Sequence, residues 1–170
     1  PFGNDGDFSH TRMAETINAD LANNIGNLAQ RTLSMIQKNC DGILPALEES
    51  ELQPIDADLL RTAQKSLVTY REQMEKFNFS GALHTLTALG SAANEYIDGQ
   101  APWALKKTDP NRMAYVLRII AEIVRTLSLM LMPFTPHASA TLLTLLGEPV
   151  EQTLDVLPQG LLRLRSQPLP

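Results

Sequence analysis

The sequence contains only one cysteine and three histidines among its 170 residues. Because Cys40 is alone, no disulfide can form within the chain. His10, His84 and His137 stand far apart and show none of the spacings typical of metal ligands. We therefore expect neither a metal site nor a bound cofactor.

Long apolar runs and targeting segments are also lacking. The most apolar stretch, residues 119–134, is broken by Glu122 and Arg125, and it is shorter than a membrane span. No basic and apolar signal segment opens the chain, so a cytoplasmic protein without membrane contact is expected. Pro1 in place of a methionine suggests a fragment of a longer polypeptide.

Catalytic motifs are missing as well. The chain has no glycine-rich phosphate loop, no His-Glu helix pair and no Gly-x-Ser-x-Gly turn. The neighbouring carboxylates of Glu48 and Glu49 lie in a polar segment, where solvent is expected to surround them. No catalytic residue is predicted, and this chain alone is not expected to be an enzyme.

The net charge of −5 argues against a general nucleic-acid coat and against DNA binding, because such proteins are basic. The charge is nevertheless uneven. Residues 41–58 carry six acids and no base, whereas residues 103–118 carry four bases and one acid. A polyanion is expected to approach the second region and to avoid the first.

Apolar residues recur at helical spacing along most of the chain. Helices are predicted near residues 20–40, 56–77, 80–97, 109–132 and 136–147. No repeat and no strand-rich block appears. The predicted fold is therefore all-α, a bundle of about five helices with short loops.

The chain divides into three predicted parts. Residues 1–9 hold two glycines and show no period, which predicts an extended connector; residues 10–147 form the bundle. The proline-rich residues 148–170 form an irregular tail that packs back on the bundle. Asn18 is the expected cap of the first clear helix, and Gly42 its expected stop.

A polar stripe runs along the predicted helix 20–40. Asp20, Asn24, Asn27 and Arg31 are spaced by four, three and four residues, so they share one face beside the apolar stripe. An asparagine amide and an arginine fork one turn apart can read a base edge and a phosphate together. The alternative is an ordinary solvated helix face.

The only tryptophan, Trp103, follows Pro102 directly after a predicted helix end, which places it on a stiff corner outside any helix. Lys106 and Lys107 come next. An aromatic ring on a rigid corner beside cations suits the stacking of an unpaired base. The alternatives are a core tryptophan that plugs the bundle end and a solvated pair of lysines.

Several motifs together resemble one known family. Residues 18–31 (NADLANNIGNLAQR) look like the signature opening of the anticodon-binding domain of methionyl-tRNA synthetases. Residues 5–9 (DGDFS), 101–106 (APWALK), 131–136 (LMPFTP), 157–160 (LPQG) and the Pro-Leu at 168–169 resemble further family segments in the same order.

This resemblance implies a class I aminoacyl-tRNA synthetase that joins methionine to its tRNA using ATP, with the ATP-binding catalytic domain elsewhere in the polypeptide. The present chain would bind the CAU anticodon. By resemblance, Trp103 stacks on an anticodon base, and Asn27 and Arg31 contact bases. Asn24 and Pro102 would support them, and Lys106 and Lys107 would attract phosphates. The partners implied are the tRNA and the catalytic domain.

A helical protein-interaction module without an RNA role is the alternative. The two functions differ in the placement of two side chains. An interaction module predicts an exposed apolar patch and indifference to RNA. Trp103 and Arg31 both accessible at one end of the bundle would favour RNA reading, and burial of both would favour the interaction module. Residues 42–66 match no family motif and receive no predicted function.

Overall fold

The computed structural model describes residues 2–148 and 168–170, and these contain six α-helices and no β-strand. The helices are α1 (Phe2–Asn39), α2 (Pro54–Glu75), α3 (Phe79–Gln100), α4 (Pro102–Thr108), α5 (Pro110–Leu131) and α6 (Pro136–Leu145). A short 3-10 turn, η1 (Glu49–Glu51), precedes α2. Because α4 has only seven residues, the bundle consists of five longer helices, as predicted.

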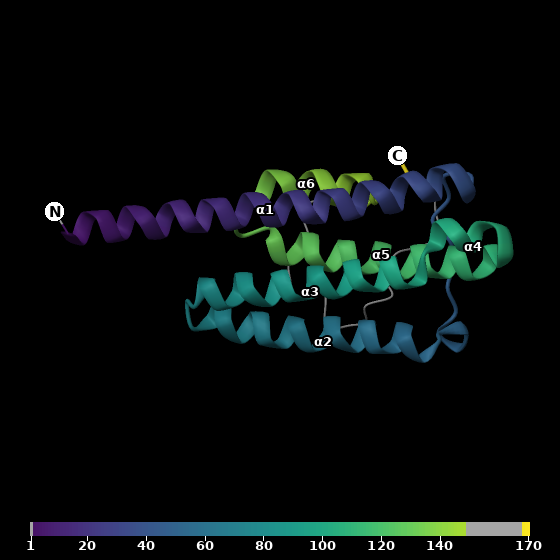
Figure 1. Ribbon diagram of the computed structural model, residues 1–170, viewed down its shortest axis with the longest axis horizontal. Coiled ribbons are helices and arrows are strands. Elements are labelled where there is room, and N and C mark those ends of the chain that lie inside the picture. The colour runs from purple at the N-terminus through teal and green to yellow at the C-terminus, as the bar shows by residue number, and fades with distance from the viewer. Residues whose placement is uncertain (1, 149–167) are drawn as a thin grey trace.

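Helix α5 lies at the centre of the bundle. It packs against α1, α2, α3, α4 and α6, while α2 and α3 form an antiparallel hairpin on one side (Figure 1). From Met113 to Leu131 nearly every side chain of α5 is buried. None of the helices in residues 2–148 combines the length and apolar character that a membrane span requires.

The predicted apolar stripe of the first helix faces this core. Leu21, Ile25, Leu28, Thr32 and Ile36 are all buried on α1. A stripe at spacings of three and four stays on one face, because a helix turns once every 3.6 residues. The polar stripe beside it therefore remains open to solvent.

Side chains cap the starts of α5 and α3. Asp109 accepts a hydrogen bond from the Arg112 backbone N–H at 3.0 Å, with Pro110 in the first turn of α5. Asn78 accepts one from the Gly81 backbone N–H at 3.1 Å at the start of α3. Each cap satisfies one of the N–H groups that a helix start leaves without a partner.

The extended connector predicted for residues 1–9 is wrong, because α1 is already helical from Phe2. The predicted cap, Asn18, consequently lies inside the helix. Two glycines in the first turns cost about 1 kcal/mol each relative to alanine. Propagation of an existing helix is nevertheless far easier than nucleation. A helix anchored on the bundle from Leu21 onward can therefore extend through a weak segment.

Helix α1 stops close to the predicted glycine. Gly42 has φ +68°, a left-handed conformation that glycine adopts without strain and that a residue with a side chain rarely adopts. The Leu169 backbone N–H donates to the Gly42 carbonyl at 2.8 Å. The end of the predicted tail therefore lies against this turn, while residues 149–167 lie outside the described part.

Charged groups inside α5 are paired within the bundle. Arg118 lies 3.0 Å from Glu122, and Arg125 lies 2.9 Å from Glu148. Arg118 also donates to the Pro45 carbonyl at 2.9 Å. The charges that interrupt the apolar run in the sequence thus serve helix packing.

Tyr70 of α2 caps the C-terminal end of α5. Its buried hydroxyl donates to the Met130 carbonyl at 2.6 Å, and burial raises the pKa of this phenol. Carbonyls in the last turn of a helix lack partners inside that helix. The Tyr70 hydroxyl supplies the missing partner from a neighbouring helix.

Replacing Tyr70 with phenylalanine should lower the free energy of unfolding by about 1–3 kcal/mol, the usual cost of a buried group that loses its partner. Urea unfolding followed by circular dichroism measures the change. Tyr115→Phe, at a half-buried position on α5, is the control. Equal effects of the two substitutions would contradict the capping role.

Candidate nucleic-acid interface

Trp103 lies in the first turn of α4, at the corner between α3 and α5. The predicted position outside any helix is therefore wrong, because Pro102 opens a short helix instead of a turn. Ala101, the residue between α3 and α4, has φ +46°, which is unusual for a residue other than glycine. Pro102 is buried, whereas Trp103 keeps 48% of its surface exposed. The corner thus presents the indole ring to solvent on a fixed backbone.

The polar stripe of α1 meets this ring. The Arg31 guanidinium carbon lies 5.4 Å from the centre of the Trp103 ring, within the range of a cation–π contact. Arg31 also lies 3.0 Å from a carboxylate oxygen of Asp98 near the end of α3. The Arg31 side chain remains 45% exposed. Two partners therefore orient an arginine that solvent still reaches.

Asn27 lies one turn before Arg31 and is exposed. Together with Gln30, Arg31 and Ser34, it lines a shallow hollow on α1. The structure thus brings Arg31 into contact with Trp103 and places Asn27 in the hollow that Arg31 also lines. Asn24, a further turn away, lies instead beside a small recess between α1 and α3.

Lys106 and Lys107 are exposed in the last turn of α4. The other two bases of residues 103–118 are not available to a polyanion. Arg112 pairs with Asp56, and Arg118 pairs with Glu122, with both arginines buried. The expectation that this whole region attracts polyanions was therefore wrong for these two residues, because charge counting along a sequence does not reveal burial.

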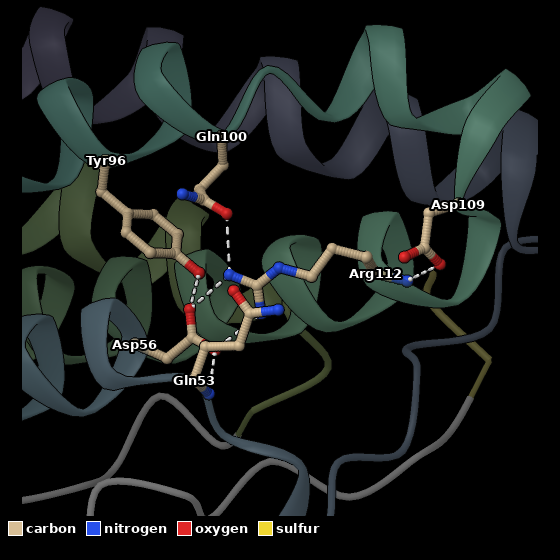
Figure 2. A network of polar contacts seen from close by, with 6 residues as sticks. All are labelled: Gln53, Asp56, Tyr96, Gln100, Asp109 and Arg112. Atoms are coloured by element: carbon tan, nitrogen blue, oxygen red, sulfur yellow. Dashed lines mark hydrogen bonds and ion pairs between the residues drawn. The ribbon is translucent and has the colours of Figure 1, made fainter.

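A buried network holds the corner in place (Figure 2). Asp56, in the first turn of α2, accepts two hydrogen bonds from the Arg112 guanidinium, at 2.6 and 2.7 Å. It also accepts one from the Tyr96 hydroxyl at 2.6 Å and one from the Gln53 backbone N–H at 2.9 Å. Arg112 donates further to Gln100 at 2.7 Å. The network joins the start of α2, the end of α3 and the start of α5.

The carboxylate of Asp56 stays charged in this setting. Burial by itself would raise its pKa, but the hydrogen bonds from Arg112, Tyr96 and the Gln53 backbone outweigh burial and hold the pKa below its usual value. Burial, reinforced by the hydrogen bond to Asp56, raises the pKa of Tyr96. The proton therefore remains on the phenol, and the charge on the carboxylate is balanced by Arg112.

Nothing in the sequence pattern pointed to Asp56, Asp98 or Ala101. Asp56 belongs to the segment that received no predicted function, and Asp98 is an exposed helix residue without a motif. The only available signal was Arg112, a charge in the first turn of the most apolar helix. A charged residue at such a position requires a buried partner, but the amino-acid sequence does not identify that partner.

The fold matches one part of solved methionyl-tRNA synthetases. It superimposes on the apo methionyl-tRNA synthetase of Mycobacterium tuberculosis with a TM-score of 0.79 and 34% identity, covering 92% of this chain and 32% of that chain. The methionyl-adenylate complex of the same synthetase superimposes with a TM-score of 0.77 and 33% identity, covering 94% of this chain and 31% of that one.

Sequence comparison agrees with the structural one. The profile of the anticodon binding domain of methionyl tRNA ligase matches residues 46–164, and that of class I (M) tRNA synthetases matches residues 1–33. The chain belongs to the family of methionyl-tRNA ligase anticodon-binding domains.

Curated relatives include two bacterial methionine–tRNA ligases. The one from Mesorhizobium japonicum is 45% identical over 89% of this chain. The one from Brucella melitensis is 42% identical over the whole chain. The present chain spans 29% and 33% of these two relatives, about a third of their length.

Replacing Asp56 with asparagine should destabilise the bundle by about 3–5 kcal/mol at pH 7, because the substitution leaves the buried Arg112 charge uncompensated. A carboxylate whose pKa is lowered by folding stabilises the fold above its unfolded pKa, about 4, and loses that effect as the pH falls through the folded value. The difference in the free energy of unfolding between the wild-type chain and Asp56→Asn should therefore become smaller below pH 4.

Urea unfolding at a series of pH values measures this gap. Asp58→Asn is the matched control, since Asp58 forms an exposed ion pair with Arg61 in the same helix. A gap that stays constant from pH 7 to pH 3, or one no larger than that of Asp58→Asn, would show that the network is not a source of stability.

Proposed function

We propose that this chain binds the CAU anticodon loop of the methionine tRNA through Trp103, Arg31 and Asn27. The observation that carries the proposal is the half-exposed Trp103 ring, with Arg31 against it and Asn27 one helical turn away. The family supplies the class of ligand, and the accessible side chains supply a place for it. Trp103 and Arg31 are both accessible to solvent, which supports RNA reading over an interaction module without RNA, the alternative that burial of both would have favoured.

Each side chain has a distinct proposed part. An unstacked base lies on the Trp103 ring, which contributes affinity with little base preference. Asn27 and Arg31 form hydrogen bonds with base edges, since an amide both donates and accepts and a guanidinium donates as a fork. Lys106 and Lys107 attract the phosphates, while Pro102 and Asn24 support the surface. On binding, an RNA group replaces Asp98 as the partner of the Arg31 guanidinium.

The wider function follows from the relatives. We infer that the chain acts within a cytoplasmic methionine–tRNA ligase, whose catalytic domain uses ATP to charge the tRNA bound here. Anticodon binding then orients the tRNA toward that domain. The described residues contain no cluster of His, Cys, Asp or Glu that could hold a metal ion. The proposal involves RNA contacts only and assigns no reaction step to these residues.

Trp103→Ala should weaken binding of a stem-loop with a CAU anticodon by about 5- to 150-fold, the range of one lost base–aromatic stack. Fluorescence anisotropy of a labelled stem-loop at low salt gives the affinity, with a scrambled loop measured in parallel. As the chain's only tryptophan, Trp103 should also lose fluorescence intensity when the wild-type chain binds. Unchanged affinity in Trp103→Ala would exclude stacking on this ring.

Arg31→Lys should lower the preference for CAU over the scrambled loop by roughly tenfold, because lysine keeps the charge but loses the fork that reads a base edge. The salt dependence should change little, since the charge is retained. Arg61→Lys is the matched control: Arg61 forms a similar exposed pair with an aspartate, on α2. A variant with unaltered preference would show that Arg31 acts only as a charge.

A further inference from the structure

Three phenylalanines form a cluster where two helix connections meet; Phe77 and Phe79 are exposed, and Phe134 is partly buried against the core. The Phe77 and Phe79 rings stand edge to face with centroids 6.3 Å apart, and Phe79 makes the same kind of contact with Phe134 at 6.4 Å. Phe77 is 79% exposed and Phe79 48% exposed. Large aromatic side chains gathered on a surface are typical of a contact with another macromolecule.

The backbone at Phe77 makes this exposure more unusual. Helix α2 ends in a Schellman motif, in which the Asn78 N–H donates to the Gln73 carbonyl and the Phe77 N–H to the Met74 carbonyl. Phe77 occupies the left-handed position of this motif, with φ +56°. Glycine normally occupies that position because a side chain is strained there. A strained residue that is almost fully exposed contributes little to the bundle itself, which indicates a role outside it.

The position of the cluster indicates which partner it meets. Phe77 and Phe79 lie at the α2–α3 turn, and Phe134 follows α5, at the end of the bundle opposite α4 (Figure 1). The first turns of α1 project beyond the bundle at this same end (Figure 1). The profile of class I (M) synthetases, which matches residues 1–33, covers these projecting turns. The polypeptide that continues α1 in a ligase therefore leaves from this end.

We propose that the phenylalanine cluster of Phe77, Phe79 and Phe134 is the surface on which the class I catalytic domain of the same polypeptide docks. The inference rests on the proposed function, because that function supplies the catalytic domain. The present chain accounts for about a third of its relatives, so a large partner remains to cover the cluster. Its contacting surface would be apolar, complementary to three phenylalanine rings.

Other occupants fit the observations less well. The proposed RNA site lies at the α4 end of the bundle, whereas the cluster lies at the opposite end (Figure 1). A second copy of the chain would have to approach past the projecting part of α1. The catalytic domain, joined to that part, is held near the cluster by covalent connection, which favours even a small contact.

The first test separates a docking role from a structural one. In the 170-residue chain, Phe77→Gly and Phe77→Asn should leave the thermal unfolding midpoint unchanged or raise it, because both residues tolerate the left-handed backbone. Val68→Ala, at another exposed apolar position on α2, is the control for lost apolar surface. A midpoint clearly lowered by both Phe77 variants would overturn the proposal, since Phe77 would then stabilise the bundle.

The second test uses hydroxyl-radical labelling, which reads the exposure of each aromatic ring. In the ligase polypeptide containing the catalytic domain, oxidation of Phe77 and Phe79 should be about tenfold slower than in the 170-residue chain. In the ligase, Phe77→Gly should restore fast oxidation of Phe79, as expected for loss of an aromatic anchor. Trp103 should be oxidised equally fast in both proteins and should be protected only by the CAU stem-loop.

Comparing the oxidation of Phe77 and Phe79 with that of Trp103 distinguishes the possible outcomes. Protection of Phe77 and Phe79 without RNA protection of Trp103 would support docking while contradicting the proposed RNA contact. Equally fast oxidation of Phe77 and Phe79 in both proteins would overturn docking, whatever Trp103 does. Protection that requires the stem-loop would assign the cluster to RNA, and protection that rises with the concentration of the 170-residue chain would assign it to a second copy. Either result would overturn the proposal.

Discussion

The candidate interface depends on one buried ion pair, between Asp56 and Arg112. The fork of Arg112 meets both oxygens of Asp56, and Tyr96 and Gln100 take up further hydrogen-bonding capacity. A buried pair is stabilising only when its geometry and its additional hydrogen bonds compensate for the loss of solvation. Here the carboxylate accepts four hydrogen bonds, so that condition is met. Because the pair joins α2 to α5 and Gln100 adds the end of α3, the helix ends on both sides of α4 are fixed by it.

The strained Ala101 explains why such a fixed frame is needed. The chain turns from α3 into α4 through a single left-handed residue, and this turn determines the direction in which Trp103 points. A left-handed conformation at a residue with a side chain is retained only when its surroundings enforce it. The Arg112 network on one side and the buried Pro102 on the other provide that enforcement. The position of the indole ring therefore depends in part on Asp56, which is far from it in the sequence.

The sequence allowed prediction of those features that depend on local pattern. The apolar stripe of α1 and the all-α fold follow from the spacing of apolar residues, and the structure confirms them. Family resemblance, rather than periodicity, brought Asn27, Arg31 and Trp103 together as one site. The structure places Arg31 against Trp103 and Asn27 one turn away, while their role in RNA binding remains a prediction.

Other features could not be predicted because they depend on long-range packing. Asp56 and Arg112 are 56 residues apart, and no local pattern links them. Arg118 counted as part of a basic region in the sequence, whereas in the fold it is buried against Glu122. The helical start of α1 was not predicted because local residue propensities argued against it. Its glycines predict a break, but a helix that is already anchored on a core continues through residues of low propensity.

Trp103 and the phenylalanine cluster differ in what surrounds their exposed rings. Trp103 is held by neighbours on both sides, and its exposed ring is partly covered by Arg31, whose own charge is balanced by Asp98. Phe77 stands edge to face with Phe79 and is more exposed than Trp103. A ring covered by a polar, exchangeable group suits a ligand that arrives and leaves. A ring left bare in a strained backbone suits a neighbour that is always present, because an uncovered apolar surface is costly in water. Helix α1 connects both situations: it carries Arg31 to the first site, and its start projects beyond the bundle at the end where the second lies (Figure 1).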